Sequence, residues 1–541
     1  MTATAKQGAA LPNGVRMVED GGPNEGAKTA QRDRLLEAVL GAGVTFWRDP
    51  DGTAYATLPA CDTSGQQRYA VRSRRFALVV RALYGRANQR SVGGRGLVIP
   101  GSVSDTALAE ALPALEAVAL DGPVCEPDVR ACRWQGAVWL DLGGPDWRLV
   151  RVRPGAWQVV DGADLPLIRP DGLRALPVPV SGPDREDTLG KLRRLVNIAP
   201  DRPQDFKLVV AWLVAALYPT GPYPVLALDG EQGSGKSTAC RMLRRLVDPN
   251  KADLRAPPRS EDDLIVAALS ARVVAVDNVS FIEADTADAL CRLATGAGLS
   301  KRRLYSDGDE HLVAVCRPVL LNGIPSLLAR GDLADRALAV TLPAIPDAQR
   351  RPEEAVWQDF EAAAPAILAL LLDALARALA DLPGLQLPRL PRMADFARLA
   401  CAAAPAFGWT ADEMLAAIEG NRADAVEAVI EADPVAVAVR AFMEGRNGQA
   451  WDGNATELLG IVNERAPMEQ QRERGYPKDA ARLSTRLRRL APALRRGGWD
   501  IALPTGGGRD GRTITIKSMR AGRLREPVVP DPDADEAGGF L

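Results

Sequence analysis

The hydrophobic positions of this 541-residue chain follow two different spacings, and the changes between them predict its elements. A run of apolar residues over 223–229 is followed by a glycine-rich turn and by an amphipathic stretch over 237–247. Short apolar runs are typical of strands buried in a parallel sheet, whereas apolar residues three and four apart are typical of helices. The pattern therefore predicts a strand, a tight loop and a helix in direct succession. Similar apolar runs over 271–277 and 317–322 predict two further strands.

The chain before residue 180 has shorter apolar runs, separated by Gly, Pro and Asp turns. Residues 1–30 are rich in Gly, Ala and Asn without periodicity, which predicts a disordered tail. The runs 137–142, 147–152 and 157–160 predict a meander of strands. We interpret 31–180 as an α+β accessory domain, whose tryptophans belong either to its core or to a binding surface.

Beyond residue 350 the spacing is mainly helical, with breaks at prolines. Two predicted helices, over 455–465 and 478–496, precede two strands around a glycine-rich turn, an arrangement similar to a winged helix. The predicted fold class is α/β, with a parallel-sheet core, an N-terminal α+β domain, a helical region and a C-terminal winged helix. The predicted segments are a disordered tail (1–30), an accessory domain (31–180), a parallel-sheet domain with lead-in helices (183–346), a helical region (352–436), a winged helix (437–520) and an acidic tail (521–541).

The loop after the first predicted strand carries a phosphate-binding motif. Residues 230–237 read Gly-Glu-Gln-Gly-Ser-Gly-Lys-Ser, which fits G-x-x-x-x-G-K-[ST]. Gly233 and Gly235 let backbone N–H groups approach phosphate oxygens, because a Cβ would obstruct them. Lys236 can reach the β- and γ-phosphates, and the Ser237 hydroxyl can bind Mg²⁺. The flanking strand and helix favour ATP and Mg²⁺ as cofactors over a chance glycine turn. The predicted nucleotide contacts are Gly230, Glu231, Gln232, Gly233, Ser234, Gly235, Lys236, Ser237 and Thr238.

The strand over 271–277 ends in Asp277, which we expect beside Mg²⁺ together with Ser237. The next residue, Asn278, stands where a second acid commonly activates water. An amide can orient water but is not a strong base, so the base is otherwise Glu283 or Asp262.

Three further features follow along the chain. The strand over 317–322 ends in Asn322, whose amide suits the positioning of water near a γ-phosphate. Two β-like runs around 307–310 predict a hairpin. Arg336, before the run 337–342, either reaches a neighbouring subunit's nucleotide or forms a surface salt bridge.

The order of these motifs resembles the superfamily 3 helicases of the AAA+ class, whose P-loop core would cover about residues 185–345. It is closest to the poxvirus-type primase-helicases and to phage and mobile-element replication ATPases. The resemblance implies that Asn322 is sensor 1, that Arg336 is an arginine finger acting in trans, and that the hairpin grips DNA in the pore of a ring. The subunits would then form a homo-oligomer, expected to be a hexamer. The DNA-facing residues of the hairpin would be Lys301, Arg302, Arg303 and His311, with Arg302 and Arg303 alternatively at the subunit interface.

The C-terminal part is strongly basic. Residues 472–520 hold 13 basic and four acidic residues, in a chain with 67 basic and 69 acidic residues. On the predicted helix Arg482, Arg486 and Arg489 share one face, and Arg512 follows on the second strand. A basic helix next to a basic hairpin is typical of nucleic-acid binding, the alternative being a solvated helical face.

Composition excludes several classes of function. His311 is the single histidine, which rules out a multi-histidine metal site. Seven cysteines without a C-x-x-C pair indicate reduced thiols. No continuous apolar run reaches the ~18 residues of a membrane span, and the start lacks a signal segment. We therefore expect a cytoplasmic protein.

These features together predict an ATP-dependent DNA helicase or DNA-stimulated ATPase of phage or mobile-element replication. Its catalytic residues would be Lys236, Asp277, Asn278, Asn322 and Arg336. We expect single-stranded DNA in the ring and duplex at the winged helix, and no membrane partner. The N-terminal domain shows no acidic primase motif, so priming is expected from another chain. The alternatives are a nucleotide-regulated DNA-binding switch, a defence NTPase and a small-molecule P-loop kinase.

Overall fold

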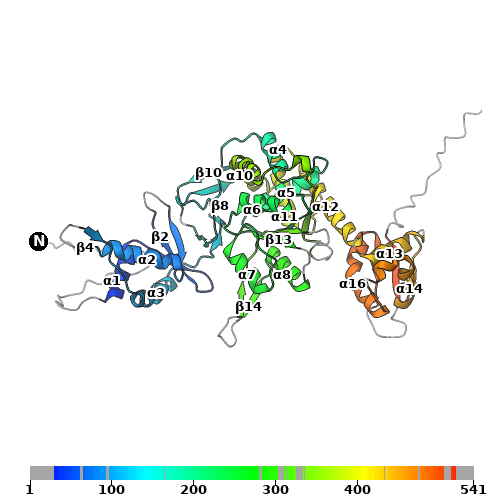
Figure 1. Cartoon of the computed structure of the whole chain (residues 1–541), viewed down its shortest axis with the longest axis horizontal. Helices are drawn as coiled ribbons and strands as arrows, with labels where there is room; N and C mark the ends of the chain where they lie inside the picture. The colour runs from blue at the N-terminus through cyan, green and yellow to red at the C-terminus, as the bar shows by residue number, and fades with distance from the viewer. Residues whose placement is uncertain are drawn as a thin grey trace, which may run out of the picture. The chain divides into compact units, whose positions relative to one another are not determined.

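The computed structural model of the chain describes residues 30–519 apart from 61–64, 93–96, 164, 280–282, 303–309, 314, 324–332, 334, 432, 447, 473–475 and 505–512. The chain forms two compact units (Figure 1). The larger unit is made of Met1–Gly323 and Val340–Ala417, and the smaller of Ile324–Ala339 and Ile418–Leu541. The predicted disordered and acidic tails lie outside the described residues, except for Ala30.

The first part of the larger unit packs three helices against a small antiparallel sheet in the order β1-β2-β3. Leu35, Phe76 and Leu115 are fully buried in its core. The Ser73 side chain begins one helix by accepting a hydrogen bond from the N–H of Phe76. The elements are α1 (Gln31–Gly41), β1 (Thr45–Arg48), β2 (Ala54–Leu58), β3 (Gln67–Ala70), α2 (Arg74–Ala87), β4 (Arg90–Val92), β5 (Leu97–Ile99) and α3 (Asp105–Leu120).

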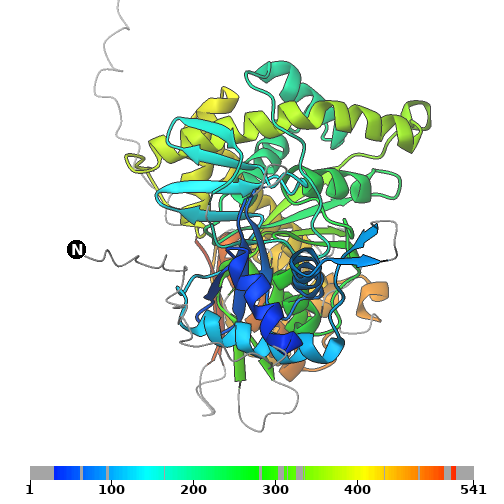
Figure 2. The ribbon, with the colours of Figure 1, turned by 90° about the vertical axis from the view of Figure 1, so that its left-hand side faces the viewer.

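The predicted strand meander is present as an antiparallel sheet in the order β10-β9-β8-β7. It lies beside the long helix α10 (Glu353–Asp381), as Figure 2 shows. Trp157 Nε1 donates to Asp373 Oδ1 of that helix over 2.7 Å. At least this tryptophan therefore has a structural partner. The elements are β6 (Asp128–Val129), β7 (Ala131–Trp134), β8 (Ala137–Asp141), β9 (Leu149–Arg153), β10 (Ala156–Val160) and β11 (Leu167–Ile168).

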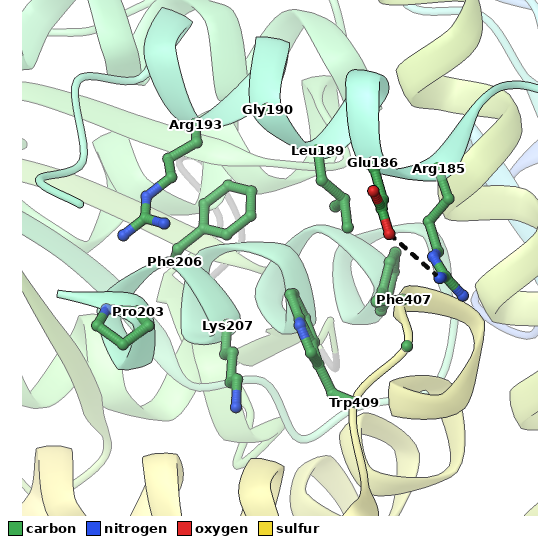
Figure 3. A pocket seen from close by; sticks show the side chains of 11 residues that line it. Arg185, Glu186, Leu189, Gly190, Arg193, Pro203, Phe206, Lys207, Phe407 and Trp409 are labelled. Atoms are coloured by element: carbon green, nitrogen blue, oxygen red, sulfur yellow. Dashed lines mark ion pairs between the residues drawn. The ribbon is translucent and has the colours of Figure 1, made fainter. Parts of the chain in front are cut away.

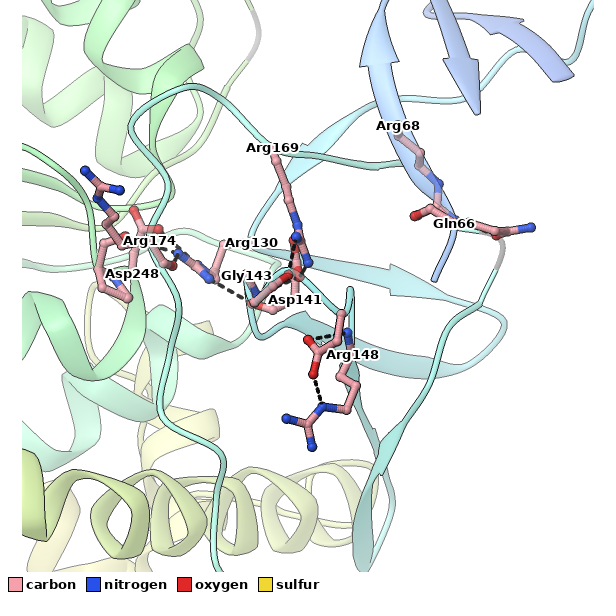
Figure 4. Close-up of polar contacts among 12 residues, drawn as sticks. Gln66, Arg68, Arg130, Asp141, Gly143, Arg148, Arg169, Arg174 and Asp248 are labelled. Carbon is pink, nitrogen blue, oxygen red and sulfur yellow. Dashed lines mark hydrogen bonds and ion pairs between the residues drawn. The ribbon is translucent and has the colours of Figure 1, made fainter. Parts of the chain in front are cut away.

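A buried ion pair connects the meander to the sheet region of the same unit (Figure 4). Arg130 Nε lies 3.1 Å from Asp248 Oδ1, and both side chains are at most 1% exposed. Asp248 ends the helix that follows the glycine-rich loop, and its other oxygen accepts from the backbone N–H groups of Arg272 and Val273. Removing either partner of such a pair would leave an uncompensated buried charge, so each residue depends on the other where the two regions meet. The sequence-based boundary at residue 180 did not anticipate this connection.

The core of the larger unit is a four-stranded sheet in the order β13-β16-β12-β17, in which β12, β16 and β13 are parallel. Leu228 of β12 pairs with Asn322 of β16, and Val276 of β13 pairs with Leu321. The carboxyl ends of these three strands therefore meet at one edge of the sheet. The elements are α4 (Arg185–Leu195), α5 (Pro203–Leu217), β12 (Val225–Gly230), α6 (Lys236–Val247), α7 (Glu261–Ser270), β13 (Val274–Val279), α8 (Ala284–Thr295), β16 (Val319–Gly323), β17 (Ala337–Leu342), η2 (Asp347–Gln349), α10, α11 (Ala394–Ala403) and η3 (Ala404–Phe407).

The predicted hairpin is present as the antiparallel pair β14 (Leu299–Arg302) and β15 (Glu310–Val313). Lys301 stands opposite His311 in its register. Arg303 lies outside the described residues.

One helix, α10, is long and apolar enough to cross a membrane by length and composition alone. The expectation of no membrane span rested on the lack of a continuous apolar run, and α10 does not supply one, because Asp373 and Arg377 interrupt it. In α10, 67% of the most apolar window is buried inside the protein, which is typical of a core helix.

The smaller unit contains a three-stranded antiparallel sheet in the order β18-β20-β19, packed with α13, α14 and α16. The predicted helices and both predicted strands are present, and β18 was missed because it has only three residues. Asn454 and Glu457 form a capping box at the start of α14. The elements are α12 (Ala411–Glu431, which begins in the larger unit), α13 (Pro434–Glu444), β18 (Trp451–Gly453), α14 (Ala455–Arg465), α15 (Met468–Gln471), α16 (Ala480–Arg496), β19 (Trp499–Ala502) and β20 (Ile514–Ser518).

Candidate nucleotide site and basic helix

The glycine-rich loop joins β12 to α6 through backbone conformations that favour glycine. Gly230, Gly233 and Gly235 have φ angles of 142°, 86° and 78°. A Cβ on Gly230 would lie 2.4 Å from the carbonyl oxygen of Leu342, so no larger residue fits there. Gly235 is the N-cap of α6, which places the free N–H groups of that helix at the loop. Such an arrangement favours an anion.

The Lys236 side chain folds back over the loop. Its Nζ donates to the carbonyl oxygens of Gly230 over 2.6 Å and of Glu231 over 2.8 Å. Ser234 is fully buried beneath, and its hydroxyl also donates to Glu231 O. The lysine charge is therefore kept at the loop, while Glu231 and Gln232 are exposed at its tip.

Beside this loop the structure brings together Ser237, Asp277 and Asn322, a group we call the strand-end cluster. Ser237 Oγ donates to Asp277 Oδ1 over 2.8 Å. Asn322 Nδ2 donates to the same oxygen over 2.6 Å and lies 3.3 Å from Ser237 Oγ. Asn322 is 1% exposed, and its Oδ1 accepts from the N–H of Asn278 over 2.5 Å. The site residues on three separate elements are thus in direct contact.

The strand-end cluster fits a magnesium ion bound to a phosphate. A hydroxyl and a carboxylate oxygen, from Ser237 and Asp277, are ligands that Mg²⁺ prefers. Two protein ligands leave positions for phosphate oxygens and water, which is how Mg²⁺ is commonly held in nucleotide sites. Within the part of the chain that the structure describes, no group of three or more His, Cys, Asp or Glu side chains could hold a metal by itself.

Burial changes the proton affinity of two groups next to the cluster. It raises the pKa of the Cys240 thiol, which lies beneath Asn322 and Asp277. The thiol is therefore neutral and acts as packing. Burial also raises the pKa of Asp229, opposed by a hydrogen bond from the Thr341 side chain.

Neither candidate base joins the strand-end cluster in the structure. Glu283 is the exposed N-cap of α8 and lines a cavity of about 420 Å³ with Val276 and Val279. Asp262 is exposed in the first turn of α7. Among the described residues, no hydrogen bond links either carboxylate to Asp277. Both remain predictions.

Sequence reasoning missed Asn197, which supports the loop from behind. It lies between α4 and α5 with a φ of 54°, and its Nδ2 donates to Ser234 O over 2.9 Å and to Pro343 O over 2.8 Å. It therefore joins the loop to the segment after β17. A single asparagine in a turn carries no sequence signal for this, because both acceptors are backbone carbonyls distant in the chain.

A second cavity, of about 360 Å³, lies between α4, α5 and η3 (Figure 3). Its wall combines three aromatic rings with three cations, and Lys207 lies 5.7 Å from the centre of the Trp409 ring. These cations already have partners. Lys207 Nζ pairs with Glu413, and Arg193 donates to the carbonyl oxygens of Ala199 and Pro200. Arg185 lies 3.9 Å from Glu186. We assign this cavity no ligand. The aromatic and cationic residues are Arg185, Arg193, Phe206, Lys207, Phe407 and Trp409.

Arg336 stands directly before β17, half-buried, and its N–H donates to Leu333 O over 3.0 Å. It belongs to the smaller unit, whereas the loop and the strand-end cluster belong to the larger. The action of Arg336 on a neighbouring subunit's nucleotide stays a prediction.

The basic helix α16 has the expected two faces. Its buried side consists of Leu483, Leu487, Leu490 and Leu494. Arg482 and Arg489 are exposed, as is Arg488, whereas Arg486 is 31% exposed and its Nε lies 2.9 Å from Asp433 Oδ2. The outer basic face therefore consists of Arg482, Arg488 and Arg489, of which Arg482 lies 3.5 Å from the exposed Asp479 carboxylate at the start of the same helix. Arg512 lies outside the described residues.

The fold is that of a mixed α/β protein with a parallel sheet, whose strand ends meet a glycine-rich loop. Residues 189–424 match the family of the actinomycete integrative conjugative element replication protein. Residues 435–529 match the AICE RepA C-terminal domain of the same family. The two matches lie in separate parts of the chain and neither alone covers half of it, so the chain is similar to this family of mobile-element replication proteins.

No curated protein matches the chain. Among solved structures, the A form of the apo C-terminal region of NrS-1 is 12% identical, with a TM-score of 0.38, covering 90% of this chain and 98% of that chain. A second apo structure of that region has 12% identity and a TM-score of 0.37, covering 91% and 100%. A JCV helicase with a bound small molecule is 12% identical, with a TM-score of 0.21, covering 42% and 74%. Likeness of this degree carries no conclusion about function.

Proposed function

We propose that this chain is an ATP-dependent DNA helicase, or a DNA-stimulated ATPase, that acts in the cytoplasm in replication of its mobile element. The observation that carries the proposal is the contact of Ser237, Asp277 and Asn322 beside the Lys236 loop. A phosphate-binding motif, a metal-binding pair and a water-positioning amide are the parts that nucleotide hydrolysis requires.

Each residue has a separate role in this proposal. Lys236 and the N–H groups that begin α6 hold the phosphates of ATP. Ser237 and Asp277 hold Mg²⁺, which neutralises charge on the phosphate oxygens when bound. Asn322 orients the attacking water, and Asn278 fixes Asn322 through the backbone hydrogen bond. Arg336 of a neighbouring subunit completes the site, in a homo-oligomer that we propose to be a hexameric P-loop ring of the AAA+ class.

DNA is the proposed partner of two elements. The β14–β15 hairpin, with Lys301, Arg302, Arg303 and His311, would contact single-stranded DNA in the ring. The smaller unit, which we interpret as a winged helix, would bind duplex through the basic face of α16. The similarity of both units to a family of replication proteins supports DNA as the partner.

The proposal is tested by ATP turnover with and without single-stranded DNA, together with a mass measurement of the complex. Lys236→Ala is expected to abolish turnover, because the loop loses its only lysine. Lys251→Ala, at an exposed lysine elsewhere, is the matched control and is expected to behave as wild type. Full turnover in Lys236→Ala, or a protein that stays monomeric and indifferent to DNA, would refute the proposal.

A second candidate function is a nucleotide-regulated DNA-binding switch that does not unwind. Asn278 favours it, because an amide next to Asp277 supplies no strong base and slow turnover suits a switch. A strand-displacement assay separates the two functions. ATP-dependent unwinding excludes the switch, and DNA binding that responds to ATP without unwinding excludes the helicase.

A further inference from the structure

Asp335, the residue directly before Arg336, forms an ion pair with the basic helix α16. Arg496, in the last turn of α16, places Nη2 2.7 Å from Asp335 Oδ2, and its Nη1 pairs with Asp335 Oδ1. The Asp335 side chain is only 7% exposed. A two-pronged pair between a guanidinium and a nearly buried carboxylate is geometrically specific, and the carboxylate is costly to leave without its partner. Asp335 must therefore follow Arg496 if the helix moves.

A second anchor lies on the other side of Arg336. Asn421 of α12 accepts a hydrogen bond from Ala339 N over 2.9 Å and donates to Ala339 O over 2.5 Å. Asn421 is 7% exposed. Both anchors and Arg336 belong to the smaller unit. The backbone that carries Arg336 is therefore held at both ends by helices of the unit that contains α16.

The helix α16 is continuous from Ala480 to Arg496 and contains Pro492. Its four leucines are buried along one side, and Arg486 pairs with Asp433, the N-cap of α13. The exposed Arg482, Arg488 and Arg489 thus lie on the same continuous helix as Arg496.

We propose that the Arg496–Asp335 ion pair, which we call the latch, couples the binding of duplex DNA to ATP hydrolysis. Duplex DNA on the outer basic face of α16 shifts the helix, and the latch transmits that shift to Arg336. Arg496 is a positioning residue in this scheme, since it acts on the nucleotide only through Arg336. The inference rests on the proposed function, because it assigns DNA to α16 and the finger role to Arg336.

The test uses the full-length chain and measures three quantities: the Kd for a fluorescent duplex, the basal ATP turnover, and the turnover at saturating duplex. Arg496→Ala and Asp335→Asn are expected to lower the duplex stimulation by about 5-fold or more, the lower range of allosteric coupling. The Kd for duplex and the basal turnover should stay near the wild-type values. Arg495→Ala is the matched control, because its partner Asp500 lies just beyond the same helix, and it should keep full stimulation. The charge-swapped double variant Arg496→Asp with Asp335→Arg should recover part of the stimulation.

Each outcome decides the question. Full stimulation in Arg496→Ala overturns the latch. A loss of stimulation that comes with an equal loss of duplex affinity, and that the charge swap does not restore, shows a merely structural pair and also overturns it. A wild-type chain that hydrolyses ATP and binds duplex without stimulation defeats the latch but leaves the proposed function standing. A wild-type chain without hydrolysis defeats the proposed function, and the latch with it.

Discussion

Asn278 shows how a backbone conformation limits the chemistry of a single position. Its φ is 53°, in the left-handed region that asparagine, aspartate and glycine tolerate best. The N–H that this conformation exposes is the one that holds Asn322. A glutamate here would be strained, so the local geometry disfavours the longer acid at this position, although it would accept an aspartate.

We predict that Asn278→Asp raises ATP turnover by about 100-fold or more, the low end of what a positioned base contributes. Aspartate tolerates the same φ and adds a carboxylate beside the metal ligand. Turnover and nucleotide Kd should be measured together, with Asn278→Gly as the control that keeps the backbone and adds no base. Equal rates in the two variants would show that the base lies elsewhere, with Glu283 the next candidate.

We also predict that Asn197→Gly weakens nucleotide binding by about 5-fold, since of its two hydrogen bonds the one to Ser234 supports the loop and is worth about 1 kcal/mol. Glycine keeps the left-handed φ of 54° and removes only the side chain that holds Ser234 and Pro343. Titration with a fluorescent ATP analogue measures the change. An unchanged Kd would mean that the loop needs no support from this side.

At the scale of elements, α16 shows what a helical pattern predicts and where it stops. The spacing of the leucines predicted the buried side, and the structure places Leu483, Leu487, Leu490 and Leu494 there. The spacing also put Arg482, Arg486 and Arg489 on one face. The spacing could not show that Arg486 would pair with Asp433, because the two residues are 53 positions apart.

The outer face of α16 gives a prediction for DNA binding. Arg488→Ala and Arg489→Ala should each lower the slope of log affinity against log salt by about 0.9, the value for one lost phosphate contact. Arg486→Ala should change the slope less, and should instead lower the free energy of unfolding by about 1 kcal/mol by breaking a partly buried ion pair. Fluorescence anisotropy at several salt concentrations and a urea titration measure the two effects. A slope change for Arg486 equal to that for Arg488 would contradict this division.

The strands and helices of the core were largely predictable, for a physical reason. β12, β13 and β16 are short apolar runs because they are buried in a parallel sheet, and such runs are visible in any sequence. The link between the meander and α6 was not predictable. It depends on Arg130 and Asp248, two charged residues 118 positions apart that ordinarily would be expected at the surface.

At the scale of the whole molecule, the proposed function places Arg336 of a neighbouring subunit in the nucleotide site. The loop and the strand-end cluster lie in one compact unit, and Arg336 belongs to the other. An arginine supplied by a neighbour can contribute ~10³–10⁵ to the rate of phosphate transfer. The proposal therefore requires an assembly of copies for full activity.

Mixing two inactive variants tests that requirement. Lys236→Ala lacks the phosphate contact but keeps Arg336, and Arg336→Ala has the opposite defect. A random equal mixture in a closed ring should regain about a quarter of wild-type turnover, because a quarter of its interfaces pair an intact loop with an intact finger. Each variant alone should remain inactive, while Arg336→Ala should still bind nucleotide. A mixture that stays inactive would place the finger in the same subunit or remove it.

The sequence by itself determined the glycine-rich loop and the acid at the end of the following strand, because a phosphate loop is local chemistry within eight consecutive residues. Only the tertiary structure decided which charges remain for a ligand. Arg486 and Arg496 look alike in the sequence as parts of one basic helix. In the fold Arg486 pairs with Asp433, and Arg496 pairs with Asp335, which is 161 positions away. A cation is available to DNA only where folding places no acidic side chain beside it.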